Sequence, residues 1–225
     1  MGKIIAWMVS FFVTTGVPSI AEMEQAFNLA QAASGATMPA EFRVNESFPL
    51  YIGAVLRDGT CHVRFNPRHQ VTAQILTGEL RGEAREAMLV AWLVHELAHC
   101  QEAQLVGESY DAALLTHPSL VEYARDQEDW RVLQDESPQA HHWSEVLADF
   151  AMLAYLNAEH PAVADTVLRH LTWLRALGGR LGDIGHDTSG YLANASADLK
   201  RQMPETVPFQ AALRLRREVG ERETP

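Results

Sequence analysis

The sequence of 225 residues lacks the features that divide a chain into several domains. Its interior contains no segment rich in proline, glycine and serine, no internal repeat and no low-complexity tract. With 47% hydrophobic residues the chain can bury a full core, so we expect a single domain. Basic residues are also scarce, because 18 Lys and Arg face 29 Asp and Glu, for a net charge of −11. This balance argues against a nucleic-acid partner and accommodates a basic or neutral peptide.

An apolar run of membrane-spanning length is also lacking. Lys3 precedes an uncharged run over 4–17, which is shorter than the about 20 residues of a typical span. Small residues follow at Ser19 and Ala21, so the first 21 residues have the pattern of a secretory signal peptide. We expect cleavage after Ala21 and export of 22–225 to the periplasm or the medium, without a stable membrane span. An uncleaved anchor or a buried helix is the alternative.

The remaining chain predicts an α+β fold with its strands near the N-terminus. A helix over 22–33 precedes short strands, and the Asp58-Gly59 pair is a strong hairpin signal. We therefore expect a small antiparallel sheet, built from 42–44, 51–56 and 61–65, followed by a mostly helical region. The expected helices cover 70–76, 83–103, 119–134, 139–158, 162–176, 189–200 and 209–219.

The helix predicted over 83–103 carries the motif His95-Glu96-Leu97-Ala98-His99. Residues four apart lie on the same helix face, so His95 and His99 can direct imidazole nitrogens at one zinc ion about 2 Å from each. Glu96 lies about 100° around the helix from His95, where its carboxylate can reach a water molecule on that metal. This arrangement is that of a zinc hydrolase.

A catalytic zinc ion usually has three protein ligands and one water, so one further ligand must come from elsewhere. Glu145 and Asp149 are four residues apart on an otherwise apolar helix face. Because an unpaired buried carboxylate is costly, we expect Glu145 to bind the metal and Asp149 to accept the N–H of a ligand histidine. Two alternatives stay open: His141 as a ligand with Glu145 outside the metal's coordination shell, or Asp149 as the ligand.

The HExxH motif at 95–99 and the ExxxD motif at 145–149 together resemble the gluzincin metallopeptidases, and most closely the thermolysin-like family. The resemblance covers 83–197 and implies a zincin-like domain over 22–225. That family also has a His-x-x-Ser-Gly segment before a later helix, and this chain has one beginning at His186.

The resemblance implies one Zn²⁺ per chain, held by His95, His99 and Glu145, with Glu96 as the general base. It also implies that His186 donates a hydrogen bond to the oxyanion of the tetrahedral intermediate.

The chain departs from that family at two positions. Ser144 stands where the family usually has asparagine. Asp183 is the candidate for the acid that supports His186, although it is closer in sequence to His186 than the family's partner acid is. The sequence around Glu145 also resembles that of the integral-membrane gluzincins. Those proteins have multiple membrane spans, which are lacking here. Glu102 and Leu105 exclude the metzincin extension.

Two cysteines, Cys61 and Cys100, form an even pair in a chain expected to reach an oxidising compartment. A disulfide between them would connect a predicted strand to the HExxH helix. Two unconnected buried thiols are the alternative, because the sequence does not show whether the Cα atoms come within reach.

Charged segments elsewhere are interpreted as solvated helix faces. The acidic segment 108–136 is one such face, with an electrostatic lip for substrate as the alternative. Arg214, Arg216 and Arg217 are interpreted as the solvent side of the last helix.

The expected function is that of a zinc-dependent metallopeptidase acting on a peptide or protein substrate. Glu96 takes a proton from the metal-activated water and later delivers it to the leaving amine. Two alternatives remain: a non-catalytic, zinc-stabilised binding protein of the cell envelope, and a zinc amidase acting on cell-wall peptide. A purely structural site has no need of the Glu96 carboxylate, which favours an enzyme.

Overall fold

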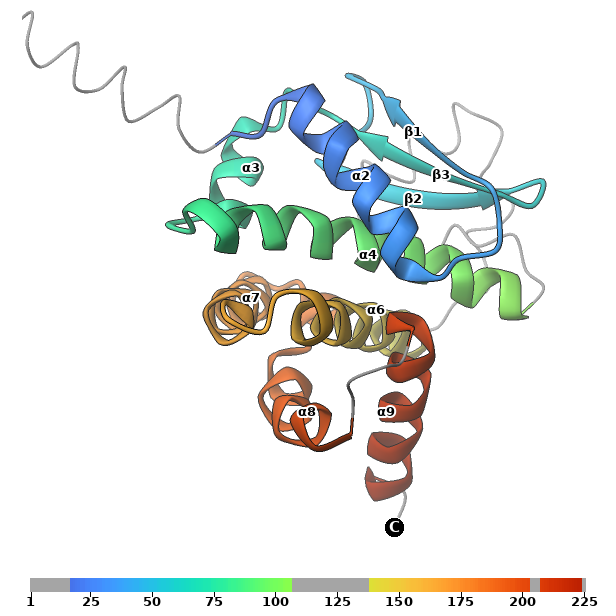
Figure 1. The fold of residues 1–225 in the computed structure, drawn as a ribbon, viewed down its shortest axis with the longest axis vertical. Helices are drawn as coiled ribbons and strands as arrows, with labels where there is room; N and C mark the ends of the chain where they lie inside the picture. Colours follow the sequence, from blue (N-terminus) through green and yellow to red (C-terminus); the bar gives the residue numbers. More distant parts are fainter. Residues whose placement is uncertain (1–16, 107–137, 203–206, 224–225) are drawn as a thin grey trace, which may run out of the picture.

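The computed structural model describes residues 17–106, 138–202 and 207–223 and confirms a mixed α+β fold (Figure 1). Within these residues, one three-stranded sheet is combined with seven α-helices and one short 3-10 helix. The strands are β1 (Ala40–Val44), β2 (Ile52–Arg57) and β3 (Thr60–Phe65). The helices are α2 (Ile20–Ser34), α3 (Gln70–Thr77), α4 (Gly82–Val106), α6 (Pro138–Glu159), α7 (Ala164–Arg180), η3 (Ile184–His186), α8 (Ser189–Gln202) and α9 (Pro208–Glu223).

Helix α4 lies between two layers. In Figure 1, α2 and the sheet are on one side of α4, and α6, α7, α8 and α9 are on the other. Nearly every residue of α4 from 87 to 100 is buried, since neighbours cover it from both sides. The helix predicted over 83–103 is therefore confirmed and is three residues longer at its C-terminal end.

The prediction of an antiparallel sheet is correct for one pair of strands and wrong for the other. β2 and β3 are antiparallel and are joined by Asp58 (φ 50°) and Gly59 (φ 74°), whose positive φ angles suit a two-residue hairpin turn. β1, however, pairs with β3 in parallel, and the strand order is β1-β3-β2. β1 ends and β2 begins at the same end of β3, so the connection 45–51 passes across that end. The hairpin signal specified only the β2–β3 pair.

Aromatic side chains fill the space between α2 and the sheet. Phe27 of α2 lies 5.6 Å from Phe42, measured between ring centroids, and Phe42 lies 5.9 Å from Phe65. Tyr51 meets the edge of the Phe65 ring at 5.2 Å. These contacts hold α2 and the sheet together as one layer above α4.

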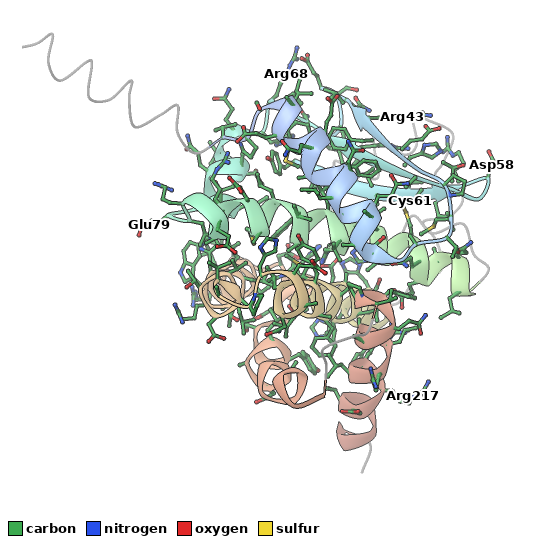
Figure 2. All side chains as sticks on the ribbon, viewed as in Figure 1. Arg43, Asp58, Cys61, Arg68, Glu79 and Arg217 are labelled. Carbon is green, nitrogen blue, oxygen red and sulfur yellow. A yellow bond between two sulfur atoms is a disulfide. The ribbon has the colours of Figure 1, made fainter. Side chains whose placement is uncertain are left out.

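A disulfide connects that layer to α4. Cys61 of β3 and Cys100 of α4 are bonded, with 5.8 Å between their Cα atoms, and both side chains are buried (Figure 2). The pairing that the sequence left open is therefore formed in the structure. It joins β3 to the helix one residue after His99.

The start of α2 bears on the predicted signal peptide. Ser19 caps the helix: its hydroxyl accepts a hydrogen bond from the Glu22 amide, and the Glu22 carboxylate accepts one from the Ser19 amide. The predicted cleavage point after Ala21 thus lies inside the first turn of α2. Residues 1–16 lie outside the described part of the chain.

Six of the seven helices predicted after the sheet are found at their expected places, with ends that differ by up to four residues. The helix expected over 119–134 and the acidic segment 108–136 lie outside the described residues. In the part of the chain that the structure does describe, no helix combines the length and apolarity needed to cross a membrane.

Candidate metal centre

Helix α4 supplies three residues of the site. His95 and His99 lie one turn apart, and their Nε2 atoms approach to 3.1 Å. Their rings converge because residues four apart stack on one helix face. His95, Glu96 and His99 are 4%, 6% and 4% exposed, since this part of α4 is covered by both layers.

Helix α6 supplies the third member of the group. Glu145 directs Oε1 to 3.3 Å from His99 Nε2 and Oε2 to 3.5 Å from His95 Nε2. One ligand atom from each residue lies within 4.8 Å of the others. Among the described residues, no group donates a hydrogen bond to Glu145 Oε2, although Arg175 Nη2 is 3.3 Å away. Two imidazoles and a carboxylate are a donor set that zinc accepts, so this buried group can hold a metal ion.

The other nitrogen of His95 is held by a carboxylate. His95 Nδ1 lies 3.0 Å from Asp149 Oδ1, as expected from the sequence. Arg175 donates two hydrogen bonds to Asp149, Nε to Oδ2 at 2.8 Å and Nη2 to Oδ1 at 2.5 Å, and Thr188 donates a third through its hydroxyl. Arg175 Nη2 also lies 3.4 Å from His95 Nδ1. The contact of His95 Nδ1 with Asp149 is shorter than its contact with Arg175 and decides the tautomer of His95. Nδ1 donates its hydrogen to Asp149, because a carboxylate only accepts.

This ion pair keeps Asp149 charged. Burial by itself would raise the pKa of Asp149, but the Arg175 guanidinium and the hydrogen bond from His95 outweigh it and lower the pKa to about 2. A negative Asp149 holds the His95 ring in one orientation.

The other nitrogen of His99 is held by a longer chain of contacts. His99 Nδ1 lies 3.0 Å from Ser144 Oγ, and the Ser144 hydroxyl donates to Glu102 Oε2 at 2.6 Å. Glu102 Oε1 accepts in turn from Arg216 of α9. Because Ser144 has one hydrogen and gives it to Glu102, its oxygen accepts the Nδ1 hydrogen of His99.

The two tautomers leave the Nε2 lone pairs of both rings facing each other and Glu145. Three such acceptors at 3.1 to 3.5 Å repel one another unless a proton or a metal ion lies between them. Burial would lower the pKa of His99, but the hydrogen bond and charge of Glu145 raise it to about 9. The group therefore attracts positive charge at the point where the three donor atoms converge.

Glu96 faces the same space from the next position on α4. It lines a cavity of about 160 Å³ together with His95, His99 and Glu145. Burial is the largest influence on Glu96 and raises the pKa of its carboxyl group. A carboxylate that gains a proton readily is suited to proton transfer when it lies beside a group that can hold a metal ion, here His95, His99 and Glu145.

Residues of η3 and of the sheet also line this cavity. His186 of η3 lines the cavity; its Nδ1 lies 2.7 Å from Asp183 Oδ1 and its Nε2 lies 3.4 Å from Glu145 Oε1. Residues 51–53, at and just before the start of β2, line it as well. The structure thus brings every predicted site residue except the disulfide pair into or directly behind one cavity, while the catalytic roles of Glu96 and His186 stay predictions.

Sequence reasoning missed two arginines, Arg175 and Arg216, that pair with the acids supporting His95 and His99. Arg216 was interpreted as solvent-facing, which is wrong, because it forms an ion pair with Glu102. The physical reason is that α9 packs along α6, which places Arg216 over the buried end of the Ser144–Glu102 pair. Arg175 carried one usable signal: it is a single arginine on the apolar face of α7 that contains Leu171 and Leu174, and it is 7% exposed.

Comparison of the chain with protein-family models, curated proteins and solved structures found no match. The class defined by the fold and site is therefore an α+β protein with a buried group able to bind a metal. The residues of this group come from the motifs at 95–99 and 145–149, whose side chains converge in the structure.

Proposed function

We propose that this protein is a zinc-dependent metallopeptidase, with Zn²⁺ bound by His95, His99 and Glu145. One observation carries the proposal. The Nε2 lone pairs of His95 and His99 converge with the Glu145 carboxylate, while Asp149 and Ser144 accept the Nδ1 hydrogens of the two rings. This is the arrangement that orients histidines as metal ligands.

A bound zinc ion would polarise the scissile carbonyl group and make an attached water molecule more acidic. Glu96 would take a proton from the attacking water and deliver it to the leaving amine. Its burial supports this role, because desolvation raises its affinity for a proton. Asp149 and Ser144 keep both ligand rings oriented throughout.

His186 is proposed to donate a hydrogen bond from Nε2 to the oxyanion in its protonated form, because Nδ1 gives its hydrogen to Asp183. Burial opposes protonation, but the charge of Glu145 and the hydrogen bond to Asp183 raise the pKa of His186. Two contacts support this role. Asp183 accepts from Nδ1 and so fixes the ring, and it leaves Nε2 directed into the cavity near Glu145. One donor of this kind typically contributes about 10²- to 10³-fold in rate.

The substrate is proposed to be a peptide or protein segment. β2 is the end strand of the sheet order β1-β3-β2, and its first residues line the cavity beside His95 and Glu96. An extended peptide that aligns with an end strand gains backbone hydrogen bonds along its length. The net charge of −11 accommodates a neutral or basic segment. Export to the periplasm or the medium is part of the same proposal.

The test combines metal content with turnover. Full-length protein is purified with zinc, freed of weakly bound metal by gel filtration, and assayed by elemental analysis and by cleavage of a mixed peptide library. We expect one retained zinc ion in the parent, little in Glu145→Ala, and full zinc with at least 100-fold slower cleavage in Glu96→Gln. Glu86→Gln, an exposed glutamate on the same helix, is the matched control and behaves as the parent.

The outcomes separate the competing classes. Zinc retention without cleavage of any peptide would favour the non-catalytic binding protein, and cleavage of cell-wall peptide alone would favour the amidase. Equal cleavage by Glu96→Gln and the parent would refute the proposed mechanism.

A further inference from the structure

His141 is a buried histidine that the proposed reaction does not use. It lies one turn before Glu145 on α6 and is 2% exposed. Neither of its ring nitrogens has a hydrogen-bond partner among the described residues. Leaving buried polar atoms unpaired is costly, and such atoms call for an explanation, for example a ligand.

His141 faces a second group of potential ligands. Its ring centroid lies 4.9 Å from that of His186, and the two rings are nearly perpendicular. His141, Glu145 and His186 each offer one ligand atom within 4.8 Å of the others. The group thus shares Glu145 with the first centre and takes its other two donors from α6 and η3.

The tautomer of His186 supports a cation at this position. Asp183 accepts the hydrogen of His186 Nδ1, so the neutral ring directs the lone pair of Nε2 toward Glu145 Oε1 at 3.4 Å. Two acceptors at this distance repel each other unless a cation or proton lies between them. The carboxylates of Glu145 and Asp183 supply negative charge around the same point.

We propose that His141, Glu145 and His186 form a second zinc-binding position, with Glu145 bridging it to the first. Binding there has a consequence that rests on the proposed function. His186 directs Nε2 into the cavity, and this nitrogen either binds the second ion through its lone pair in the neutral ring or donates to the oxyanion in the protonated ring. Occupation of the second position therefore inhibits hydrolysis, so excess zinc slows the enzyme.

The test counts zinc ions on full-length protein that has been stripped of metal and dialysed to equilibrium against rising concentrations of free zinc. We expect two ions per chain in the parent and one in both His141→Ala and His186→Ala. The double variant also binds one ion, because both histidines serve the same position. His160→Ala removes a histidine outside both groups and keeps two ions.

Folding is checked by far-ultraviolet circular dichroism on each variant. If His141→Ala does not fold, His186→Ala decides the question, because His186 is only half-buried on η3. A parent that saturates at one ion, or single variants that keep two, would overturn the second position.

Turnover at rising free zinc separates this proposal from the first. We expect the parent rate to fall by about 100-fold as the second position fills, which is the usual cost of losing one oxyanion donor. The rate of His141→Ala, relative to its own rate at limiting zinc, should not decline as free zinc rises. If the parent binds one zinc ion and hydrolyses peptide, only the second zinc position is refuted. If it binds two zinc ions and hydrolyses no peptide, only the proposed peptidase activity is refuted.

Discussion

Substitution of Asp149 by asparagine tests the contacts that support the metal group. The change keeps the side chain's size and removes its charge. His95 Nδ1 loses its charged acceptor, and among the described residues Glu145, 3.3 Å away, is the remaining carboxylate within ion-pair distance of Arg175. Arg175 would then compete with a bound metal ion for Glu145, so both stability and zinc affinity should fall.

The size of the stability loss follows from the pKa of Asp149. Its folded-state pKa of about 2 lies below the ordinary 3.8, so the charged form is favoured by folding. Each pKa unit corresponds to about 1.4 kcal/mol, so charge on Asp149 stabilises the fold by about 2 kcal/mol at neutral pH. Loss of one partner from a buried ion pair typically costs about 3–5 kcal/mol, so we expect a loss of about 2–5 kcal/mol.

The pH dependence has a definite sign. A depressed pKa contributes stability that is fully present above the unfolded-state value of 3.8 and is lost as the pH falls toward the folded-state value of about 2. The stability difference between the parent and Asp149→Asn should therefore be largest at neutral pH and shrink between pH 4 and pH 2.

The assay is guanidinium unfolding of metal-free protein across this pH range, followed by zinc affinity from competition with a chelator. Zinc should bind about 10- to 100-fold more weakly to Asp149→Asn, as for other partners of ligand histidines. Asp58→Asn is the control, because asparagine also tolerates the positive φ of this exposed turn. Equal stability and equal zinc affinity in Asp149→Asn and the control would refute the reasoning.

Three further predictions concern the contacts around the site and its layer. Ser144→Ala leaves His99 Nδ1 and Glu102 without their shared partner and should weaken zinc binding about 10- to 100-fold in the chelator assay; unchanged affinity would show that His99 needs no such support. Replacement of both Cys61 and Cys100 by serine should destabilise the protein by about 2–4 kcal/mol in guanidinium unfolding, because the disulfide closes a loop across 39 residues. A difference near zero would show that the layer of α2 and the sheet stays on α4 without the disulfide. A chain that begins after residue 21 lacks the Ser19 cap and should be about 1 kcal/mol less stable than one that begins at residue 17; equal melting temperatures would contradict this role of the cap.

Residues that act through local periodicity were predictable. His95 and His99 are four apart on a helix, and so are Glu145 and Asp149, so each pair had to share a face wherever the helix was placed. The polar residues on those apolar faces pointed to buried partners. The contact between Asp149 and His95 followed from the same need to pair a buried carboxylate, and it is formed at 3.0 Å.

Residues that act through distant packing were not predictable in the same way. Arg175 reaches Asp149 across 26 residues of sequence, and Arg216 reaches Glu102 across 114. Neither pair has a spacing that distinguishes it from other arginines and acids in the chain. The parallel pairing of β1 with β3 was missed for a related reason, because a short connection across the end of β3 leaves no turn signal of its own.

The sequence by itself determined most of the helices that the structure describes, the histidine pair on α4 and the acid pair on α6, because helical spacing is a local property of the chain. Only the tertiary structure decided which carboxylate faces the two histidines, that Cys61 meets Cys100, and that His141 and His186 share Glu145 from the far side. Those contacts depend on how α4, α6 and η3 pack against one another, and packing is set by the sum of many buried contacts that no single spacing records.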